Sequence, residues 1–189
     1  YYSWGMYPEN ISDKTKVLHD ELVKLGQELL DWIDIFTPDS IRSSFSMLLS
    51  EMVSNSKTNL LRIIHYPPLE DNIKEGEIRA AAHEDINLIT LLAAGTQTGL
   101  QVQTKDNTWL DVECDPGWII INIGDMLSEC SAGYFPSTTH RVINPVGDAK
   151  KLSRYTMPLF LHPRDEVKLS NKYTAKSFLE ERLRELGLK

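Results

Sequence analysis

Apolar positions in the first third of the chain recur at spacings of three and four. Within residues 12–36 these positions are Leu18, Leu22, Leu25, Leu29 and Trp32. Such spacing places them on one face of an α-helix. After the stretch "TPDS", a second set follows at Ile41, Phe45, Leu48 and Met52. This set predicts a second helix, with Thr37 as its N-cap and Pro38 at its first helical position.

From about residue 59 the pattern changes to short β-rich runs separated by turn residues. Eight runs can be read, over 59–66, 78–85, 87–93, 99–104, 108–113, 118–124, 138–144 and 154–162. Closely spaced strands without helical patterns between them indicate a sandwich, a barrel or a jelly roll. Helical spacing returns at the end of the chain. We therefore expect a single, mainly β domain with flanking helices: a helical N-terminal segment over residues 1–58, a β-core over residues 59–163 and a C-terminal helix over residues 172–189.

Composition narrows the class of protein. The 189 residues are 41% hydrophobic and 25% charged, which is typical of soluble globular proteins. A net charge of −7 argues against nucleic acid as a partner, because phosphate binding needs a basic surface. No apolar run suggests a membrane span and no signal peptide is evident. Cys114 and Cys130 form no CxxC motif, so we expect a reducing, cytoplasmic setting. The oligomeric state is not set by the sequence.

The stretch "AAAHEDINLIT" holds His83 and Asp85 two positions apart. On a strand, residues i and i+2 point to the same side. If His140, in "STTHRVIN", joined them, two imidazoles and one carboxylate would bind one face of a metal ion. This is the facial triad of non-haem Fe(II) sites. An HxD pair alone is a weak motif, and a zinc site with an activated water is an alternative.

A third feature is "RYT" at the start of the last run. Arg154 and Thr156 share one face of a strand by the same period of two. A guanidinium offers a bidentate grip on a carboxylate, and a hydroxyl adds a further donor. A cation in a run that ends "MPLFL" needs an anionic partner if it is buried. The alternative for this pair is a surface salt bridge.

Taken together, the motifs resemble a known family. "HED", "GLQV", "W–DV", "PGWIIINIGDML", "STTHRVINP" and "RYTMPLF" occur in the order found in the 2-oxoglutarate- and Fe(II)-dependent dioxygenases of the isopenicillin N synthase-like branch. The resemblance covers about residues 59–163 and implies a double-stranded β-helix, or jelly-roll, core. It implies that Fe(II) is bound by His83, Asp85 and His140. It also implies that Arg154 and Thr156 bind 2-oxoglutarate, with threonine in place of the family's usual serine.

The run "LLRIIHYPP" resembles the strand that precedes the metal motif in this family. Tyr66 falls where a tyrosine often contacts 2-oxoglutarate, and Ile64 stands where the family often has asparagine. Arg62 resembles a substrate-binding arginine of the expandase branch and would favour an acidic substrate. Alternation places Arg62, Ile64 and Tyr66 on one face of the strand. A solvent-facing Arg62 is the alternative.

The resemblance implies an enzyme that consumes O2 and couples oxidative decarboxylation of 2-oxoglutarate to hydroxylation or related C–H oxidation. We expect a small, carboxylate-bearing metabolite as the substrate. An iron oxidase that does not use 2-oxoglutarate and a catalytically silent binding protein remain open. Members of this branch have a longer N-terminal region than the 58 residues before the resemblance. Either the start of the chain is missing or this is a compact variant.

Overall fold

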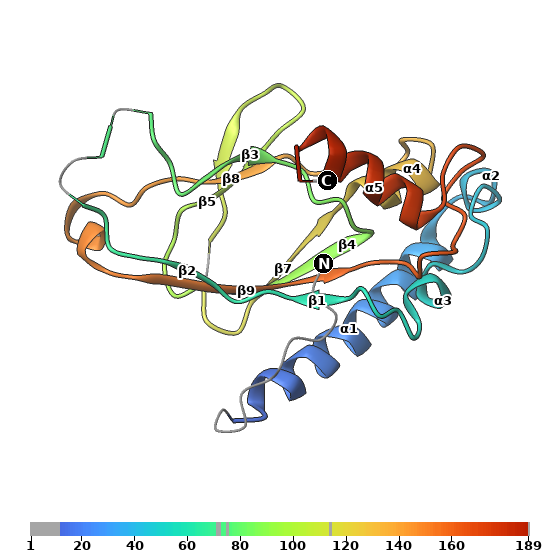
Figure 1. Cartoon of the computed structure of the whole chain (residues 1–189), viewed down its shortest axis with the longest axis horizontal. Helices are drawn as coiled ribbons and strands as arrows, with labels where there is room; N and C mark the ends of the chain where they lie inside the picture. The colour runs from blue at the N-terminus through green and yellow to red at the C-terminus, as the bar shows by residue number, and fades with distance from the viewer. Residues whose placement is uncertain (1–11, 71–72, 75, 114, 189) are drawn as a thin grey trace.

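Two antiparallel sheets face each other and form the centre of the molecule (Figure 1). The computed structural model describes residues 12–70, 73–74, 76–113 and 115–188, so the first 11 residues of the predicted helical segment lie outside the described ranges. The five-stranded sheet consists of β1 (Leu60–Leu61), β2 (Ile64–Tyr66), β4 (Ile89–Ala93), β7 (Ile119–Ile123) and β9 (Arg154–Leu161). The four-stranded sheet consists of β3 (Ala80–His83), β5 (Leu100–Gln103), β6 (Trp109–Asp111) and β8 (His140–Val142). The predicted mainly β fold with a jelly-roll core is confirmed.

The order of strands explains how distant segments meet. The five-stranded sheet runs β1-β9-β4-β7, with β2 also paired to β9, and the four-stranded sheet runs β3-β8-β5-β6. The strand β9 therefore lies beside strands that precede it by more than 60 residues in the sequence. Two short helical segments, α4 (Asp125–Cys130) and the 3-10 helix η1 (Gly147–Lys151), interrupt the β region. The alternating pattern of the runs had not predicted either segment.

The first amphipathic segment forms the predicted helix, α1 (Lys14–Phe36), which covers the outer face of the five-stranded sheet (Figure 1). Its Leu22 and Leu30 are buried in the same core as Leu91 and Leu161 of the sheet. A Cβ at Gly26 would lie 2.1 Å from Leu161, so the missing side chain allows the helix to approach the strand closely. At the chain's end, α5 (Ala175–Glu185) confirms the predicted C-terminal helix.

The predicted second helix is wrong in its continuity. The segment forms two short helices, α2 (Asp39–Arg42) and α3 (Leu49–Val53), with a turn between them. Serine hydroxyls in this turn donate to main-chain carbonyls, as Ser44 does to Ile41 and Ser46 to Lys168. Such bonds compete with helix formation. Thr37 is likewise not an N-cap, because its hydroxyl donates to the carbonyl of Ile33 at the end of α1.

The strand β3 contains an irregularity that matters for the site. Ala80 lies opposite Val142 of β8, and His83 lies opposite His140. Three steps along β3 therefore match two steps along β8, which is the arrangement of a β-bulge. Without the extra residue, side chains three positions apart would face opposite sides of the sheet. Because of the bulge, Ala80 and His83 both line the space between the two sheets.

Candidate metal centre and the cavity beside it

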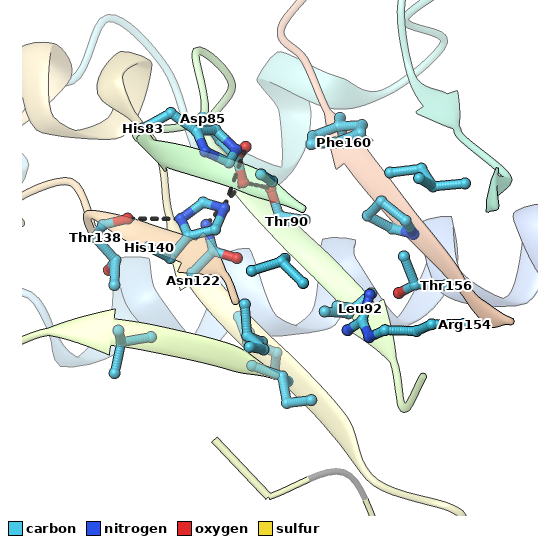
Figure 2. A pocket seen from close by; sticks show the side chains of 18 of the residues that line it. His83, Asp85, Thr90, Leu92, Asn122, Thr138, His140, Arg154, Thr156 and Phe160 are labelled. Atoms are coloured by element: carbon cyan, nitrogen blue, oxygen red, sulfur yellow. Dashed lines mark hydrogen bonds and ion pairs between the residues drawn. The ribbon is translucent and has the colours of Figure 1, made fainter. Parts of the chain in front are cut away.

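A cavity lies between the inner faces of the two sheets. His83, Asp85 and His140 line one end of this cavity, and Arg154 and Thr156 line the other (Figure 2). The wall between these ends is mostly apolar and includes Leu92, Leu100, Val102, Ile120, Val142 and Pro158. A largely apolar wall keeps bulk water out and strengthens electrostatic interactions inside the cavity.

The three predicted ligands lie together. One potential ligand atom from each of His83, Asp85 and His140 lies within 4.8 Å of the others. The two histidines face each other across the β3–β8 pair, with ring centroids 4.3 Å apart. Asp85 follows two residues after the end of β3, so it lies in the loop beyond the strand. Its carboxylate is 7% exposed, whereas His83 is exposed at the end of the cavity.

Main-chain carbonyls select the tautomer of both imidazoles. The Nδ1 of His83 lies 2.7 Å from the carbonyl oxygen of Ala81, and that of His140 lies 2.9 Å from the carbonyl oxygen of Thr138. A carbonyl oxygen can only accept, so each Nδ1 carries the proton and each Nε2 keeps a free lone pair. The Nε2 of His140 is 3.9 Å from Oδ1 of Asp85. This arrangement is how proteins orient histidine ligands toward a metal.

The second oxygen of Asp85 is engaged by the protein. Its Oδ2 accepts a hydrogen bond from the hydroxyl of Thr90 at 2.6 Å and another from the amide of Asn122 at 2.9 Å. Thr90 was not identified as a site residue in the sequence. The available signal was a polar residue at an inward position of the apolar run 87–93. One carboxylate oxygen is thus held by the sheet, while the other faces His140.

The far end of the cavity holds a buried cation without a counter-ion among the described residues. Arg154 is 1% exposed, its Nε donates to the carbonyl of Gln97 at 3.1 Å, and its Nη1 has no hydrogen-bond partner. The hydroxyl of Thr156 is also buried without a partner. Unpaired buried donors are costly. A carboxylate of a bound molecule would satisfy both groups, so this end fits an anionic co-substrate.

The model of the 2OG-Fe(II) oxygenase superfamily matches residues 57–163. The chain belongs to this superfamily. The superfamily uses Fe(II) as its metal and 2-oxoglutarate and O2 as co-substrates, as the resemblance implied. The His2Asp donor set is also the one that suits Fe(II) with open coordination positions.

Three relatives illustrate the similarity. Gibberellin 2-beta-dioxygenase 3 of Arabidopsis thaliana is 32% identical over 143 residues, which are 76% of this chain and 41% of that protein. A crystal structure from Shewanella oneidensis, provisionally named an oxygenase, has a TM-score of 0.91 and 54% identity over 100% of this chain and 70% of its own. A Caulobacter crescentus structure, provisionally named a 2OG-Fe(II) oxygenase family protein, has a TM-score of 0.74 and 30% identity over 98% and 65%. The chain spans less than half the length of curated relatives such as the gibberellin dioxygenase.

Tyr66, predicted to contact the co-substrate, lines the cavity, whereas Arg62, predicted to bind the substrate, does not. Tyr66 lies directly opposite Arg154 in the β2–β9 pair, and its ring centroid is 5.3 Å from the guanidinium carbon. The main-chain pairing with β9 continues between Leu61 and Ile64, because the N–H of Arg62 donates to the carbonyl of Pro158, so the expected alternation holds for the backbone. Arg62 is exposed, and its role in substrate binding stays a prediction.

Within the described residues, no helix combines the length and apolar character needed to cross a membrane. The longest of the described helices, α1, packs on β4, β9 and α3. The cytoplasmic location expected from the sequence stays a prediction.

Proposed function

We propose that this chain binds Fe(II) and 2-oxoglutarate and uses O2 to oxidise a C–H bond of a small molecule. One observation carries the proposal: Nη1 of Arg154 and the hydroxyl of Thr156, buried without partners among the described residues, lie across an apolar cavity from the His2Asp ligand set. A hydrolytic metal site would need the ligands alone, and it would give no reason to bury a guanidinium without a counter-ion. When bound, the iron and its co-substrate supply the oxidation, with 2-oxoglutarate converted to succinate and CO2.

At the metal end, His83, Asp85 and His140 bind the ion. The two carbonyl-anchored imidazoles present Nε2, and the carboxylate contributes the negative charge of the ligand set. Because these ligands come from neighbouring backbone positions on β3, β8 and the loop after β3, they occupy one side of the ion. The side toward the cavity is left for the co-substrate.

At the other end, Arg154 and Thr156 bind the remote carboxylate of 2-oxoglutarate. The guanidinium offers Nη1 and the threonine offers its hydroxyl, and neither has a hydrogen-bond partner in the described part of the chain. Tyr66 lies beside the guanidinium and positions it through its ring. The apolar side chains between the ends exclude water from the path, so the co-substrate is oriented and its charged group is held in a low-dielectric setting.

Members of the family act on small molecules, and we propose the same for this chain. A carboxylate-bearing substrate was expected from Arg62. Arg62 is exposed and does not line the cavity, so the cavity does not support this expectation. The substrate class rests on the sequence resemblance alone.

The proposal is tested by anaerobic titration of the purified apo-protein with Fe(II) and 2-oxoglutarate, following the visible metal-to-ligand charge-transfer band. We expect a band in the wild type, its loss in Asp85→Ala, and a much higher 2-oxoglutarate requirement in Arg154→Met. Arg141→Met serves as the matched control, because Arg141 stacks on Trp109 and bonds to Gln101 away from the cavity. Succinate formation in air is the second readout.

The outcomes are distinct. Fe(II) binding without a band at any 2-oxoglutarate concentration would overturn the co-substrate assignment and favour an iron oxidase that does not use 2-oxoglutarate. Failure to bind Fe(II) would overturn the metal assignment as well. An equal response of the Arg154 and Arg141 variants would show that the buried guanidinium is not the anchor.

A further inference from the structure

The carboxylate of Asp85 is held through one of its two oxygens. Oδ2 accepts from two donors on two strands, Thr90 of β4 and Asn122 of β7 (Figure 2). Oδ1 has no such donor among the described residues and lies 3.9 Å from Nε2 of His140. The two oxygens of one group are therefore chemically distinguished by the protein before any ion arrives.

The direction of the threonine bond is itself fixed by a third residue. The side-chain amide of Asn87 donates to the carbonyl of Ile89 at 3.0 Å and to the hydroxyl of Thr90 at 2.9 Å. A hydroxyl has a single proton, so Thr90 cannot donate back to Asn87 and its proton is directed to Asp85. Asn87 is completely buried and Thr90 is 3% exposed, so water does not compete for these bonds.

Gly124 leaves the space that Asn87 occupies. A Cβ at Gly124 would lie 2.3 Å from both the side-chain oxygen and the main-chain oxygen of Asn87, and 2.8 Å from the carbonyl of Asp85. The φ of Gly124 is −109°, which any residue can adopt. The glycine is therefore needed for space, not for its backbone freedom. The backbone after β7 closes directly over Asn87 and fixes it in place.

We propose that Thr90 and Asn122, with Asn87 orienting Thr90, are positioning residues that make Asp85 bind the metal through Oδ1 alone. The inference rests on the proposed function and deepens it. Oδ2 already accepts two hydrogen bonds from the five-stranded sheet. If the carboxylate turned to chelate the ion through both oxygens, it would lose these bonds. A one-oxygen ligand leaves room for a bidentate co-substrate and O2, whereas a chelating carboxylate would occupy one of those positions.

A merely structural role is the competing explanation, since three buried polar residues also stabilise the sheet. The two roles differ in what they predict for the metal. A structural role would lower the melting temperature of the apo-protein and leave the coordination of a bound ion unchanged. A positioning role changes the affinity and the coordination geometry of the ion in a protein that is still folded.

The test uses Thr90→Val, which keeps the shape and removes the hydroxyl, and Thr90→Ser, which restores it. Fe(II) affinity is measured anaerobically, and Co(II) is added separately because its visible absorption reports coordination number and geometry. Loss of such an outer partner of a ligand typically costs 10–100-fold in metal affinity, and we expect a fall of about that size for Thr90→Val. Thr90→Ser should lie close to the wild type, and Thr98→Val, at an exposed site between β4 and β5, is the matched control.

Asn122→Leu provides a second route if Thr90→Val does not fold, because Asn122 lies on the edge strand β7. We expect weaker Fe(II) binding and an altered Co(II) spectrum here too. Wild-type affinity and an unchanged Co(II) spectrum in the folded Thr90→Val or Asn122→Leu protein would overturn the inference and leave the proposed function intact. If the wild type itself bound neither ion, the proposed function would fail first, and the two failures are thus distinguishable.

Discussion

Thr156 illustrates how much a single side chain can contribute at this site. Its hydroxyl is buried without a hydrogen-bond partner in the ranges that the structure describes, and the residue lies opposite Ile64 in the β2–β9 pair. A hydrogen bond from such a group to a charged ligand is worth about 1.5–3 kcal/mol, because water does not compete for it. The resemblance placed serine at this position in the family. Threonine keeps the same oxygen and adds a methyl group.

Replacing Thr156 with valine should therefore weaken 2-oxoglutarate binding by about 10-fold or more, which is the equivalent of that lost hydrogen bond. Fe(II) affinity in the absence of 2-oxoglutarate should not change, since Thr156 lies at the opposite end of the cavity from the ligands (Figure 2). The charge-transfer band, followed against 2-oxoglutarate concentration, gives the dissociation constant. Thr156→Ser is the control and should bind as the wild type does; equal binding by the valine variant would contradict the assignment.

At the residue scale, the sequence was informative where a strand is regular. A period of two placed Arg154 and Thr156 on one face, and both line the cavity because β9 is unbroken over Arg154–Leu161. The pairing with β9 continues from Leu61 through Arg62 to Ile64, so the rule holds for the backbone at Arg62. Its side chain is nevertheless exposed and does not line the cavity, which a period of two could not predict. Thr90 was missed because its importance comes from Asp85, which reaches it only in three dimensions.

At the scale of elements, the joint between α1 and α3 depends on one buried acid. Asp34 is 4% exposed, and its Oδ2 accepts from the main-chain N–H of Leu49, at 2.6 Å, at the start of α3. Such first-turn N–H groups have no partner inside the helix. Burial raises the pKa of the Asp34 carboxyl above its usual value near 3.8. The carboxylate thus accepts the hydrogen bond that caps α3, and a neutral amide oxygen could accept the same bond.

Asp34→Asn should keep the cap and remove the cost of the buried charge. A raised pKa means that the folded state holds the proton more tightly, so wild-type stability falls as pH rises through the raised value. The stability of Asp34→Asn relative to the wild type should therefore increase from pH 4 to pH 7. Asp34→Ala leaves the Leu49 N–H unpaired and should lose about 1–3 kcal/mol. Urea unfolding at both pH values measures this; an asparagine variant that loses stability relative to the wild type as pH rises would refute it.

Elements were predictable to the extent that their pattern was local. The apolar stripe of α1 and the β-rich runs of β4 and β9 carry their own signal, and these elements form where expected. The second helix broke because serine hydroxyls in the turn bond to distant carbonyls, including that of Lys168. No local pattern contains such partners. The bulge in β3 is similarly invisible, since three successive alanines look the same on either face.

At the scale of the whole molecule, acid stability should depend on His162, at the point where the chain leaves β9. Its main-chain N–H donates to the side chain of Asn59, just before β1, and its Nδ1–H donates to the carbonyl of Phe160. Burial lowers the pKa of His162 to about 4, from an ordinary value of 6.5. The ring is consequently neutral in the folded protein at pH values where it takes up a proton in the unfolded chain.

Between pH 6.5 and 4 the unfolded state therefore binds more protons than the folded state, and stability falls as pH falls through this window. The loss is at most about 3–4 kcal/mol, given about 1.4 kcal/mol for each unit of pKa. His162→Gln should flatten this section of the stability profile, whatever it does to the absolute value. Melting temperatures at several pH values check this, with the exposed His65→Gln as the control for loss of an imidazole. An unchanged slope in His162→Gln would exclude this histidine as the cause.

The bulge in β3 separates the position of His83 from the exact number of residues in the strand. Ala80 and His83 are three steps apart, and both line the cavity only because the bulge takes up the extra residue. Deleting Ala82 would leave two steps on each strand, so regular pairing would still place the imidazole of His83 opposite His140. We expect the deletion variant to keep Fe(II) binding in anaerobic titration, and loss of binding would show that the bulge itself orients the ring. This strand can therefore lose one residue before the HxD motif without moving the ligand set.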